Sequence, residues 1–245
     1  MNLALILLAA GHGTRFGGPK QLVAVDAQGA CIPERSVRDA ADAGFDCAVL
    51  VVRPDHLGIW ETKNWPMPVY FVVQESANGT GHAIRLGMLR ALDLGCETWA
   101  VGNGDDYYGS LWQSAKPYAE RGWIGALAYP LSAVCSPHGP VNRALLDRSD
   151  NGLLTGITER EGLTRADVAI LGNPLVSMNA WLFNSDTLQW WPSGGTDSGE
   201  FGIPDAVRAG IAQGIPLRVD ALGSEWIGMT FAADQAHVWA YFERT

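Results

Sequence analysis

A glycine-rich loop with two cationic residues lies close to the N-terminus. It spans residues 11–20 (GHGTRFGGPK) and directly follows an apolar run. Glycines allow backbone N–H groups to approach a polyphosphate closely and to point at its oxygen atoms. Arg15 can offer phosphate a planar fork of donors, whereas Lys20 offers a mobile point charge. In a chain with a formal net charge of −9, two cations in such a loop predict a polyphosphate site.

Two other kinds of phosphate loop do not fit this sequence. A P-loop needs Ser or Thr after its lysine, but Gln21 follows Lys20 here. A dinucleotide fingerprint needs the spacing G-x-G-x-x-G, and Gly17 comes one position too late after Gly11 and Gly13. A dinucleotide-dependent oxidoreductase is therefore disfavoured.

Acidic residues form a second candidate segment, Asn103–Gly109 (NGDDYYG), which also follows an apolar run. Carboxylate oxygens at a strand end, opposite a triphosphate loop, are the ligands that Mg²⁺ requires. We predict Asp105 as the metal ligand. Asp106 ranks second for this role, and we assign it to substrate binding.

A third segment begins at Gln74 and continues through Gly79, Thr80 and His82 into a helical pattern. A Gln amide offers one acceptor and two donors, which suits the N3–H and O4 edge of uracil or thymine. The N-terminus of a helix also favours a nearby phosphate. We therefore predict nucleotide binding at Gln74, Gly79 and Thr80. His82 is expected to have a structural place at the helix start, with no acid or base role.

The elements that must position these segments alternate between strands and helices. Apolar runs of strand type occur at Leu3–Leu8, Cys47–Val52, Val69–Val73, Thr98–Val101 and Ile124–Tyr129, and helical patterns lie between them. This alternation predicts an α/β fold with a Rossmann-like, doubly wound, mostly parallel sheet. Its right-handed crossovers place the loops that follow the strands on one edge, where ligands bind.

The pattern changes after about residue 130. Gly139–Leu146, Leu154–Glu159 and Leu175–Phe183 have the composition of strands in a smaller, mixed β part. No linker separates this part from the rest. We therefore expect a single domain over residues 1–245, with a nucleotide-binding half (1–130) and a substrate-binding half (131–245).

The bulk composition excludes several classes of partner. The chain has 17 basic and 26 acidic residues, which argues against nucleic acid or an anionic membrane as a general partner. Its four cysteines are widely spread, as in neither a zinc site nor a disulfide framework, and suit a reducing cytoplasm. The apolar N-terminal run is too short for a signal peptide, and no run reaches membrane-spanning length. We expect a cytoplasmic protein, and the sequence leaves the oligomeric state open, a homo-oligomer included.

The run Leu8–Leu22 resembles the signature loop L-A-A-G-x-G-[ST]-R-x(n)-P-K-x-L of the nucleotidyltransferase family, which includes the sugar-1-phosphate nucleotidyltransferases, or NDP-sugar pyrophosphorylases. The resemblance implies the nucleotide-diphospho-sugar transferase fold. It also implies that Arg15 holds the β- and γ-phosphates and that Lys20 bridges the α-phosphate and the attacking phosphate, as the catalytic residues. The remaining nucleotide contacts would come from Ala10, Gly11, Gly13 and Thr14.

Further segments carry the same resemblance. The stretch from Gln74 to Ala83 is similar to Q-x(4)-G-T-[AG]-H-A, which reads the base in uridylyl- and thymidylyltransferases, and Asp105 matches the metal-binding G-D motif. Glu159 matches the glutamate of the family's [IV]-x-E-K segment, which accepts hydrogen bonds from sugar hydroxyls, although Arg160 replaces the lysine.

Two more positions are assigned by the same comparison. Asn179 lies where the family has a sugar-contacting strand, which makes it a candidate for substrate binding. Related sugar enzymes often carry a second metal-binding Asp in a W-x-D-x-G-T stretch, but this chain has Gly228 at that place. Asp220, Glu225 and Asp234 are the acidic neighbours, and we favour Glu225 as the second metal ligand.

Together these features predict a Mg²⁺-dependent enzyme that transfers a nucleoside monophosphate from an NTP to a sugar 1-phosphate and releases pyrophosphate. UTP or dTTP is the favoured donor. The alternatives are cytidylyl or guanylyl transfer to another phosphorylated small molecule or a phosphonate. A relative that binds nucleotide without turnover would be expected to lack Arg15, Lys20 or Asp105, and all three are present.

Overall fold

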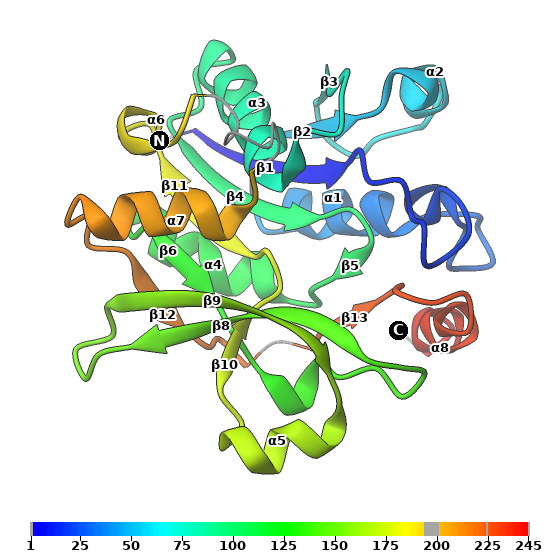
Figure 1. Ribbon diagram of the computed structural model, residues 1–245. Coiled ribbons are helices and arrows are strands. Elements are labelled where there is room, and N and C mark those ends of the chain that lie inside the picture. The colour runs from blue at the N-terminus through cyan, green and yellow to red at the C-terminus, as the bar shows by residue number, and fades with distance from the viewer. Residues whose placement is uncertain (1, 194–200, 224, 245) are drawn as a thin grey trace.

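Strands and helices alternate through the first half of the chain, as the sequence predicts. The computed structural model describes residues 2–193, 201–223 and 225–244 (Figure 1). No helix in these ranges is both long and apolar enough to span a membrane. The strands are β1 (Leu3–Ala9), β2 (Cys47–Val52), β3 (Val69–Val73), β4 (Thr98–Asn103), β5 (Asp106–Tyr107), β6 (Gly125–Leu127), β7 (Tyr129–Pro130), β8 (Val141–Arg148), β9 (Leu154–Leu163), β10 (Leu175–Ser177), β11 (Trp181–Asn184), β12 (Arg218–Asp220) and β13 (Ile227–Gly228). The helices are α1 (Ile32–Asp42), α2 (Leu57–Glu61), α3 (Gly79–Asp93), α4 (Leu111–Glu120), α5 (Arg165–Leu171), α6 (Thr187–Trp190), α7 (Ile203–Ala212) and α8 (Asp234–Phe242), with 3₁₀ turns at Lys20–Leu22, Pro54–His56 and Leu131–Ala133.

The large sheet has the strand order β12-β6-β11-β4-β1-β2-β3. Strands β4, β1, β2 and β3 are mutually parallel, β6 and β12 are parallel to each other, and β11 runs antiparallel to both β4 and β6. The predicted α/β class with a mostly parallel sheet is confirmed. Because β1 lies at the centre, the loop that follows it opens at the carboxyl edge between β2 and β4.

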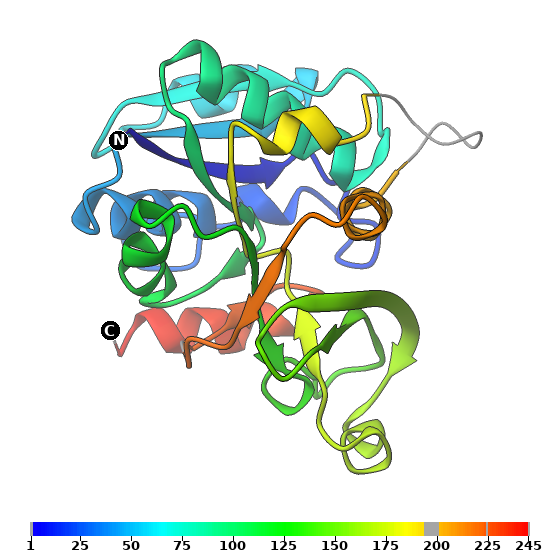
Figure 2. The same ribbon diagram turned by 90° about the vertical axis from the view of Figure 1, so that its left-hand side faces the viewer.

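Helices cover both faces of this sheet, and β1 shows why. Leu3, Leu5 and Leu7 pack in one hydrophobic cluster with the buried faces of α1 and α4. Ile6 and Leu8 pack in a second cluster with the buried face of α3. Alternate residues of a strand point to opposite faces, so a continuous apolar run is what a strand covered on both sides requires. Figure 2 shows α3 on one side of these strands and α1 with α4 on the other.

A smaller antiparallel sheet, with the order β7-β10-β8-β9, lies below the large one in Figure 1. Strands β8 and β9 form a long hairpin with a turn at residues 149–153. A third, two-stranded sheet joins β13 to β5 and pairs Gly228 with Asp106. This pairing brings the C-terminal part of the chain against the acidic segment that follows β4.

Two segments predicted as single strands each divide between the two sheets. The run Ile124–Tyr129 becomes β6 in the large sheet and β7 in the small one, and Leu175–Phe183 becomes β10 and β11. The break in the second case lies at Asn179, whose φ of 58° is the left-handed conformation. A non-glycine residue adopts this conformation seldom, although asparagine does so more readily than most. Asn179 therefore stands where the chain crosses between the sheets.

Candidate active site

The glycine loop after β1 folds back on itself and leaves its cations at one side. The backbone N–H groups of Phe16 and Gly17 donate to the carbonyl oxygen of Gly13, at 3.0 and 2.9 Å. Gly13 has a φ of 63°, and a Cβ atom at this position would lie 2.0 Å from the carbonyl oxygen of Gly18. Only glycine fits this close backbone contact. The tight turn of this loop therefore requires glycine at position 13.

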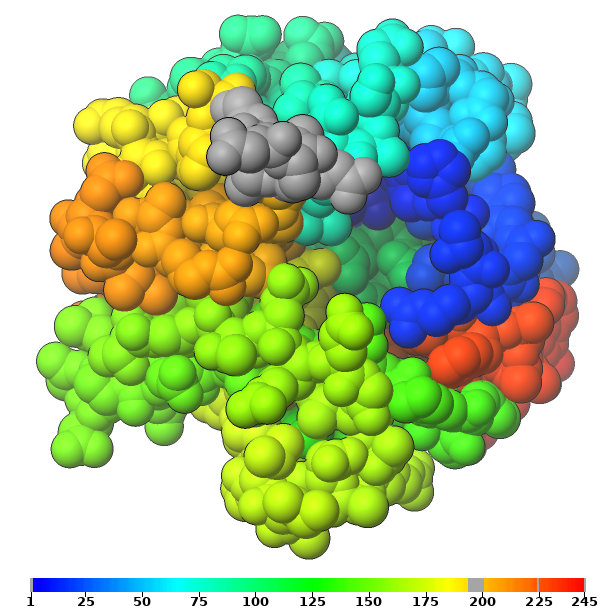
Figure 3. Space-filling view, in the orientation of Figure 1, coloured from blue at the N-terminus to red at the C-terminus, as the bar shows by residue number. Residues whose placement is uncertain are grey.

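A cavity of about 400 Å³ opens beside this loop. Its lining includes the cations Arg15 and Lys20 and the neutral side chain of Gln74. Figure 3 shows the surface hollowed between the N-terminal loop (blue), helix α7 (orange) and the small sheet (green to yellow-green). All the residues that the sequence assigns to nucleotide binding line this cavity, namely Ala10, Gly11, Gly13, Thr14, Gln74, Gly79 and Thr80.

A second cavity, of about 310 Å³, adjoins the first. It is lined by the predicted substrate residues Asp106, Glu159 and Asn179, together with Arg143 and Arg160. The two cavities share part of their walls. The residues that line both are Arg15, Lys20, Thr80, Asn103, Asp105 and Asn179.

Lys20 and Asp105 form an ion pair where the two cavities meet. Lys20 comes from the glycine loop after β1 and Asp105 from the loop after β4. Because β1 and β4 are parallel neighbours, both loops leave the same edge of the sheet. Both side chains remain partly exposed, at 17% and 19%, so a ligand can reach them.

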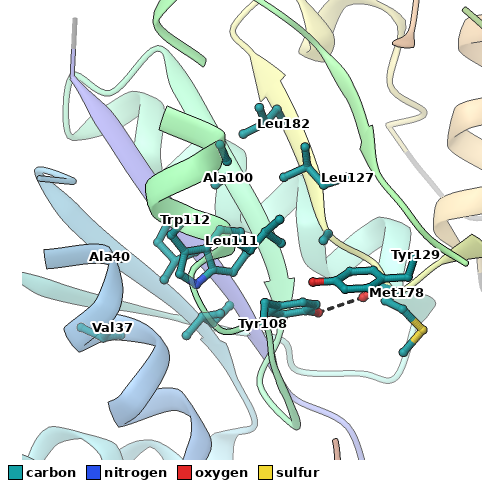
Figure 4. Close-up of a cluster of buried hydrophobic side chains, with 14 of the residues drawn as sticks. Val37, Ala40, Ala100, Tyr108, Leu111, Trp112, Leu127, Tyr129, Met178 and Leu182 are labelled. Carbon is teal, nitrogen blue, oxygen red and sulfur yellow. Dashed lines mark hydrogen bonds between the residues drawn. The ribbon is translucent and has the colours of Figure 1, made fainter. Parts of the chain in front are cut away.

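A hydrogen-bond relay ties the acidic segment to the sheet crossing. The backbone N–H of Asn103 donates to the Tyr108 hydroxyl at 2.8 Å. The same hydroxyl donates to the carbonyl oxygen of Met178 at 2.8 Å (Figure 4). The Asn179 amide nitrogen then donates to Asn103 Oδ1 at 3.1 Å, and Asn103 Nδ2 donates to Asp106 at 2.8 Å. Tyr108 is completely buried, so the relay lies in the core and fixes both asparagine side chains.

Asp106 is a buried carboxyl group, with 5% of the residue exposed. Burial, followed by the charge of Asp105, raises the pKa of the Asp106 carboxyl to about 7. A Cβ atom at Gly228 would lie 2.3 Å from Asp106 Oδ1. The carboxylate thus fills the space that a side chain at Gly228 would need, which explains why glycine occurs there.

Arg143 was not among the residues that we assigned from the sequence. It is half-buried on β8 and lines the second cavity. Its guanidinium lies 5.6 Å from the centre of the Trp226 ring and donates to the carbonyl oxygens of Val134 and Asn142. Burial lowers its pKa. Its Nε atom is buried without a hydrogen-bond partner among the described residues, so a donor is left over beside the cavity.

Gln21 was also missed. It is 2% exposed, lines the first cavity, and donates weakly to the carbonyl oxygen of Gly11 at 3.4 Å. Its Oε1 atom is buried with no hydrogen-bond partner among the described residues. A buried amide oxygen left unpaired is costly, and a ligand in the cavity can supply the missing donor. The only signal in the sequence was its position directly after Lys20.

Thr80 has a structural contact in addition to its place in both cavities. Its hydroxyl oxygen accepts a hydrogen bond from the N–H of Ile203 at 3.3 Å. The N–H of Gly81 donates to the carbonyl oxygen of Phe201 at 3.0 Å. These bonds attach the start of α7 to the start of α3.

Glu225 does not join this site. Its carboxylate accepts a hydrogen bond from the Tyr241 hydroxyl at 3.0 Å and lines a separate cavity with Asp39 and Tyr107. The chain beyond it turns so that Gly228, and not Glu225, pairs with Asp106. We therefore do not retain Glu225 as a metal ligand. We chose Glu225 because it lies beside Trp226 in the sequence, but this position does not bring it to the cavities that Asp105 lines.

The remaining oxygen donors suit a metal that binds mainly through its substrate. No group of three or more His, Cys, Asp or Glu side chains that could hold a metal occurs within residues 2–193, 201–223 and 225–244. Asp105 and Asp106 offer carboxylates at the junction of the cavities. Mg²⁺ commonly uses one or two carboxylates together with substrate phosphates and water, so this donor set fits Mg²⁺ when a triphosphate is bound.

Comparisons with known proteins agree with this geometry. Residues 5–108 match the family described as the MobA-like NTP transferase domain. Among solved structures, a UDP-glucose pyrophosphorylase complexed with UDP-glucose has a TM-score of 0.71 and 17% identity and covers 100% of both chains. No curated protein sequence matches the chain.

Two further solved structures have the same fold. The inositol-1-phosphate CTP transferase from T. maritima has a TM-score of 0.75 and 15% identity, and the alignment covers 98% of this chain and 95% of that one. HddC from Yersinia pseudotuberculosis has a TM-score of 0.65 and 15% identity, with 98% and 99% covered. The nucleotide-diphospho-sugar transferase fold is confirmed.

Proposed function

We propose that this chain, whose residues 5–108 match the MobA-like NTP transferase domain family, transfers a nucleoside monophosphate from UTP or dTTP to a sugar 1-phosphate and releases pyrophosphate. The observation that best supports this proposal is the junction of two cavities at Arg15, Lys20 and Asp105. One cavity is lined by the glycine loop and by the amide of Gln74, which suit a triphosphate and a base. The other is lined by carboxylates and arginines, which suit hydroxyl groups and a phosphate.

The reaction needs two substrates on opposite sides of one phosphorus atom. An oxygen of the acceptor phosphate attacks the α-phosphorus of the NTP. The bond from that phosphorus to the oxygen bridging to the β-phosphate then breaks, and pyrophosphate leaves with the electron pair. Catalysis of this kind rests on positioning and on neutralising charge.

The cations of the loop have separate parts in this scheme. Lys20 lies at the junction of the cavities, where it can neutralise the α-phosphate and the incoming phosphate together. Arg15 can hold the β- and γ-phosphates with its planar fork and stabilise the charge on the leaving pyrophosphate. The Glu159 carboxylate and Asn179 Oδ1 can accept hydrogen bonds from the acceptor's hydroxyl groups.

Mg²⁺ would be held by Asp105, with Asp106 beside it. When bound, it supplies neutralising charge to the triphosphate. Before the substrate binds, Lys20 occupies the Asp105 carboxylate. The ion pair must therefore open when Lys20 turns to the phosphates, and this frees Asp105 for the metal.

The test is a pyrophosphate-release assay of each NTP against a panel of sugar phosphates, with and without EDTA. We expect release with UTP or dTTP and a sugar 1-phosphate, and its loss when EDTA removes Mg²⁺. Full activity in metal-free buffer would contradict the mechanism. The panel should include phosphorylated alcohols, a phosphonate, CTP and GTP, because cytidylyl or guanylyl transfer to another acceptor is the alternative that uses the same site.

A further inference from the structure

Gln74 follows β3, is 8% exposed and lines the first cavity. Its amide nitrogen contacts two acceptors at once. Nε2 lies 3.1 Å from the carbonyl oxygen of Gly79 and 3.2 Å from Nδ1 of His82. An amide NH₂ group has two hydrogens, so both are used within the protein.

The chemistry of these partners fixes the orientation of the amide. The Gly79 carbonyl can only accept, so the nitrogen and not the oxygen of the Gln74 amide must face it. An amide nitrogen does not accept hydrogen bonds, so His82 Nδ1 must carry no proton and accept as well. Burial, and then the charge of Arg85, lowers the pKa of His82, which is consistent with a neutral ring at pH 7.

This leaves one hydrogen-bonding atom of Gln74 for a ligand. Within the described residues no donor is bonded to Oε1, and the side chain lines the cavity. His82 itself does not line the cavity and contacts Gln74 from behind. A base in the cavity therefore meets an acceptor and no donor from this residue.

We propose that His82 and the Gly79 carbonyl together hold the Gln74 amide so that only Oε1 faces the base, and that His82 thereby selects a pyrimidine with a protonated N3. This rests on the proposed function, since it specifies how the same nucleotide site chooses its base. Uracil and thymine donate N3–H to such an oxygen. Cytosine has a lone pair at N3, which would face the lone pairs of Oε1. His82 is a positioning residue, because it acts through Gln74.

The variants compare histidine with two residues of similar size. His82→Leu removes the acceptor and frees one N–H of Gln74, which can then turn to the N3 lone pair of cytosine. His82→Asn keeps an acceptor oxygen close to the place of Nδ1. His237→Leu, on the exposed face of α8, controls for loss of a histidine elsewhere.

The measurement is the ratio of UTP affinity to CTP affinity with Mg²⁺, by calorimetry, apart from turnover. We expect the wild type to prefer UTP, His82→Leu to lower the ratio about three- to tenfold, the effect of one hydrogen bond, and His82→Asn to stay within about twofold of wild type. In a Gln74→Ala background, His82→Leu should change the ratio no further.

The outcomes separate the two claims. A wild type that binds CTP as tightly as UTP, an unchanged ratio in His82→Leu, or an equal loss in His82→Asn overturns the role of His82. An effect of His82→Leu that persists in the Gln74→Ala background shows that His82 does not act through Gln74, and it also overturns the role. Absence of pyrophosphate release with every NTP and acceptor counts instead against the proposed function, since the binding ratio is measured without it.

Discussion

At the scale of single residues, the two groups to which we assign the most direct chemical roles form an ion pair with each other. Lys20 and Asp105 come from neighbouring loops and meet at the junction of the cavities. In the proposed complex each would bind a different partner, Lys20 the phosphates and Asp105 the metal. Because the two side chains pair with each other and are partly exposed, neither charge is buried without a partner.

Replacing Lys20 tests its part in the reaction. Lys20→Ala should lower turnover by at least about 10²-fold, because it removes charge stabilisation of the transition state. The melting temperature should change little, since the side chain is part of a surface loop. Lys116→Ala, which removes a half-buried lysine whose Nζ donates to the Gly44 carbonyl oxygen, is the matched control and should keep wild-type turnover. Near wild-type rates in Lys20→Ala would show that the loop is not catalytic.

Metal binding can be tested on the acidic residues separately. Mn²⁺ affinity, measured by electron paramagnetic resonance in the presence of UTP, should fall at least about tenfold in Asp105→Asn. Asp106→Asn should have a smaller effect. Glu225→Gln should leave the affinity unchanged, because Glu225 lies in another cavity beside Tyr241. A larger loss in Asp106→Asn than in Asp105→Asn would reverse the ranking of the two carboxylates.

The sequence was informative where chemistry depends on consecutive residues. The loop from Ala10 to Lys20 and the acidic segment around Asp105 lie at the cavities because each directly follows a buried strand. Gln21 and Arg143 were missed because their importance arises from unpaired atoms that only the folded chain reveals. Glu225 was misplaced because the β13–β5 pairing, which decides which residue reaches Asp106, has no local sequence signal.

At the scale of elements, long apolar runs were predicted well and crossings between sheets were not. Strands β2 and β3 have the predicted bounds, and the bounds of β1 differ by one residue. The run Leu175–Phe183 looked continuous because both β10 and β11 are apolar. The left-handed residue between them, Asn179, is one asparagine within a mostly apolar run, so the sequence does not mark the break.

The attachment of α7 to α3 makes Gly81 sensitive to substitution. A Cβ atom there would lie 2.8 Å from the Gly202 carbonyl oxygen and 2.4 Å from the Phe201 ring. Gly81→Ala should therefore lower the free energy of unfolding by about 1–3 kcal/mol through overpacking. Gly58→Ala in α2 has nothing within 4 Å and should not destabilise the protein. Equal chemical denaturation curves for the two variants would contradict this packing.

The segment before α1 is held by Asp26, which is 3% exposed. Its carboxylate accepts from the N–H groups of Gln28 and Ala30 and from Arg35 Nε, at 2.7–2.9 Å. Burial opposes its ionisation, but the Ala30 amide and the Arg35 guanidinium outweigh burial and hold the pKa of Asp26 below its usual value.

Because the pKa of Asp26 is lowered in the folded protein, the contribution of Asp26 to stability depends on pH. The stabilisation is present above the unfolded-state pKa of about 4 and is lost as pH falls through the lower folded-state pKa. Asp26→Asn should cost about 1–3 kcal/mol at pH 7 and flatten the decline of stability below pH 4. Asp55 forms an exposed ion pair with Arg53, and Asp55→Asn should change neither the stability at pH 7 nor its decline below pH 4. Urea unfolding from pH 3 to pH 7 measures both effects, and parallel curves for wild type and Asp26→Asn would contradict the assignment.

At the scale of the whole molecule, the proposed nucleotide site and the proposed acceptor site draw on different sheets. The first cavity depends on loops of the large sheet and the second includes strands β8 and β9 of the small one. The sequence suggested this division through its change of pattern near residue 130. It did not indicate that β11 and β12, which come after residue 130, join the large sheet.

Ligand binding should stabilise the folded chain through mass action. UTP with Mg²⁺ at about 100 times its dissociation constant should raise the melting temperature by about 5–10 °C. EDTA should remove most of this shift, because the triphosphate needs the metal at Asp105. Differential scanning calorimetry measures the shift, and an equal shift with and without EDTA would argue against metal-dependent nucleotide binding. A sugar 1-phosphate alone should have a smaller effect.

The left-handed residue Asn179 joins the two sheets and lines both cavities, and its amide is fixed to Asn103 by a hydrogen bond. The chain also passes between the sheets from β6 to β7, so Asn179 is one of the connections that a movement of the small sheet against the large one would change. Because Asn179 lines both cavities, we expect a substrate in one cavity to change the affinity of the other cavity for its own substrate, with Asn179 as one route of this coupling.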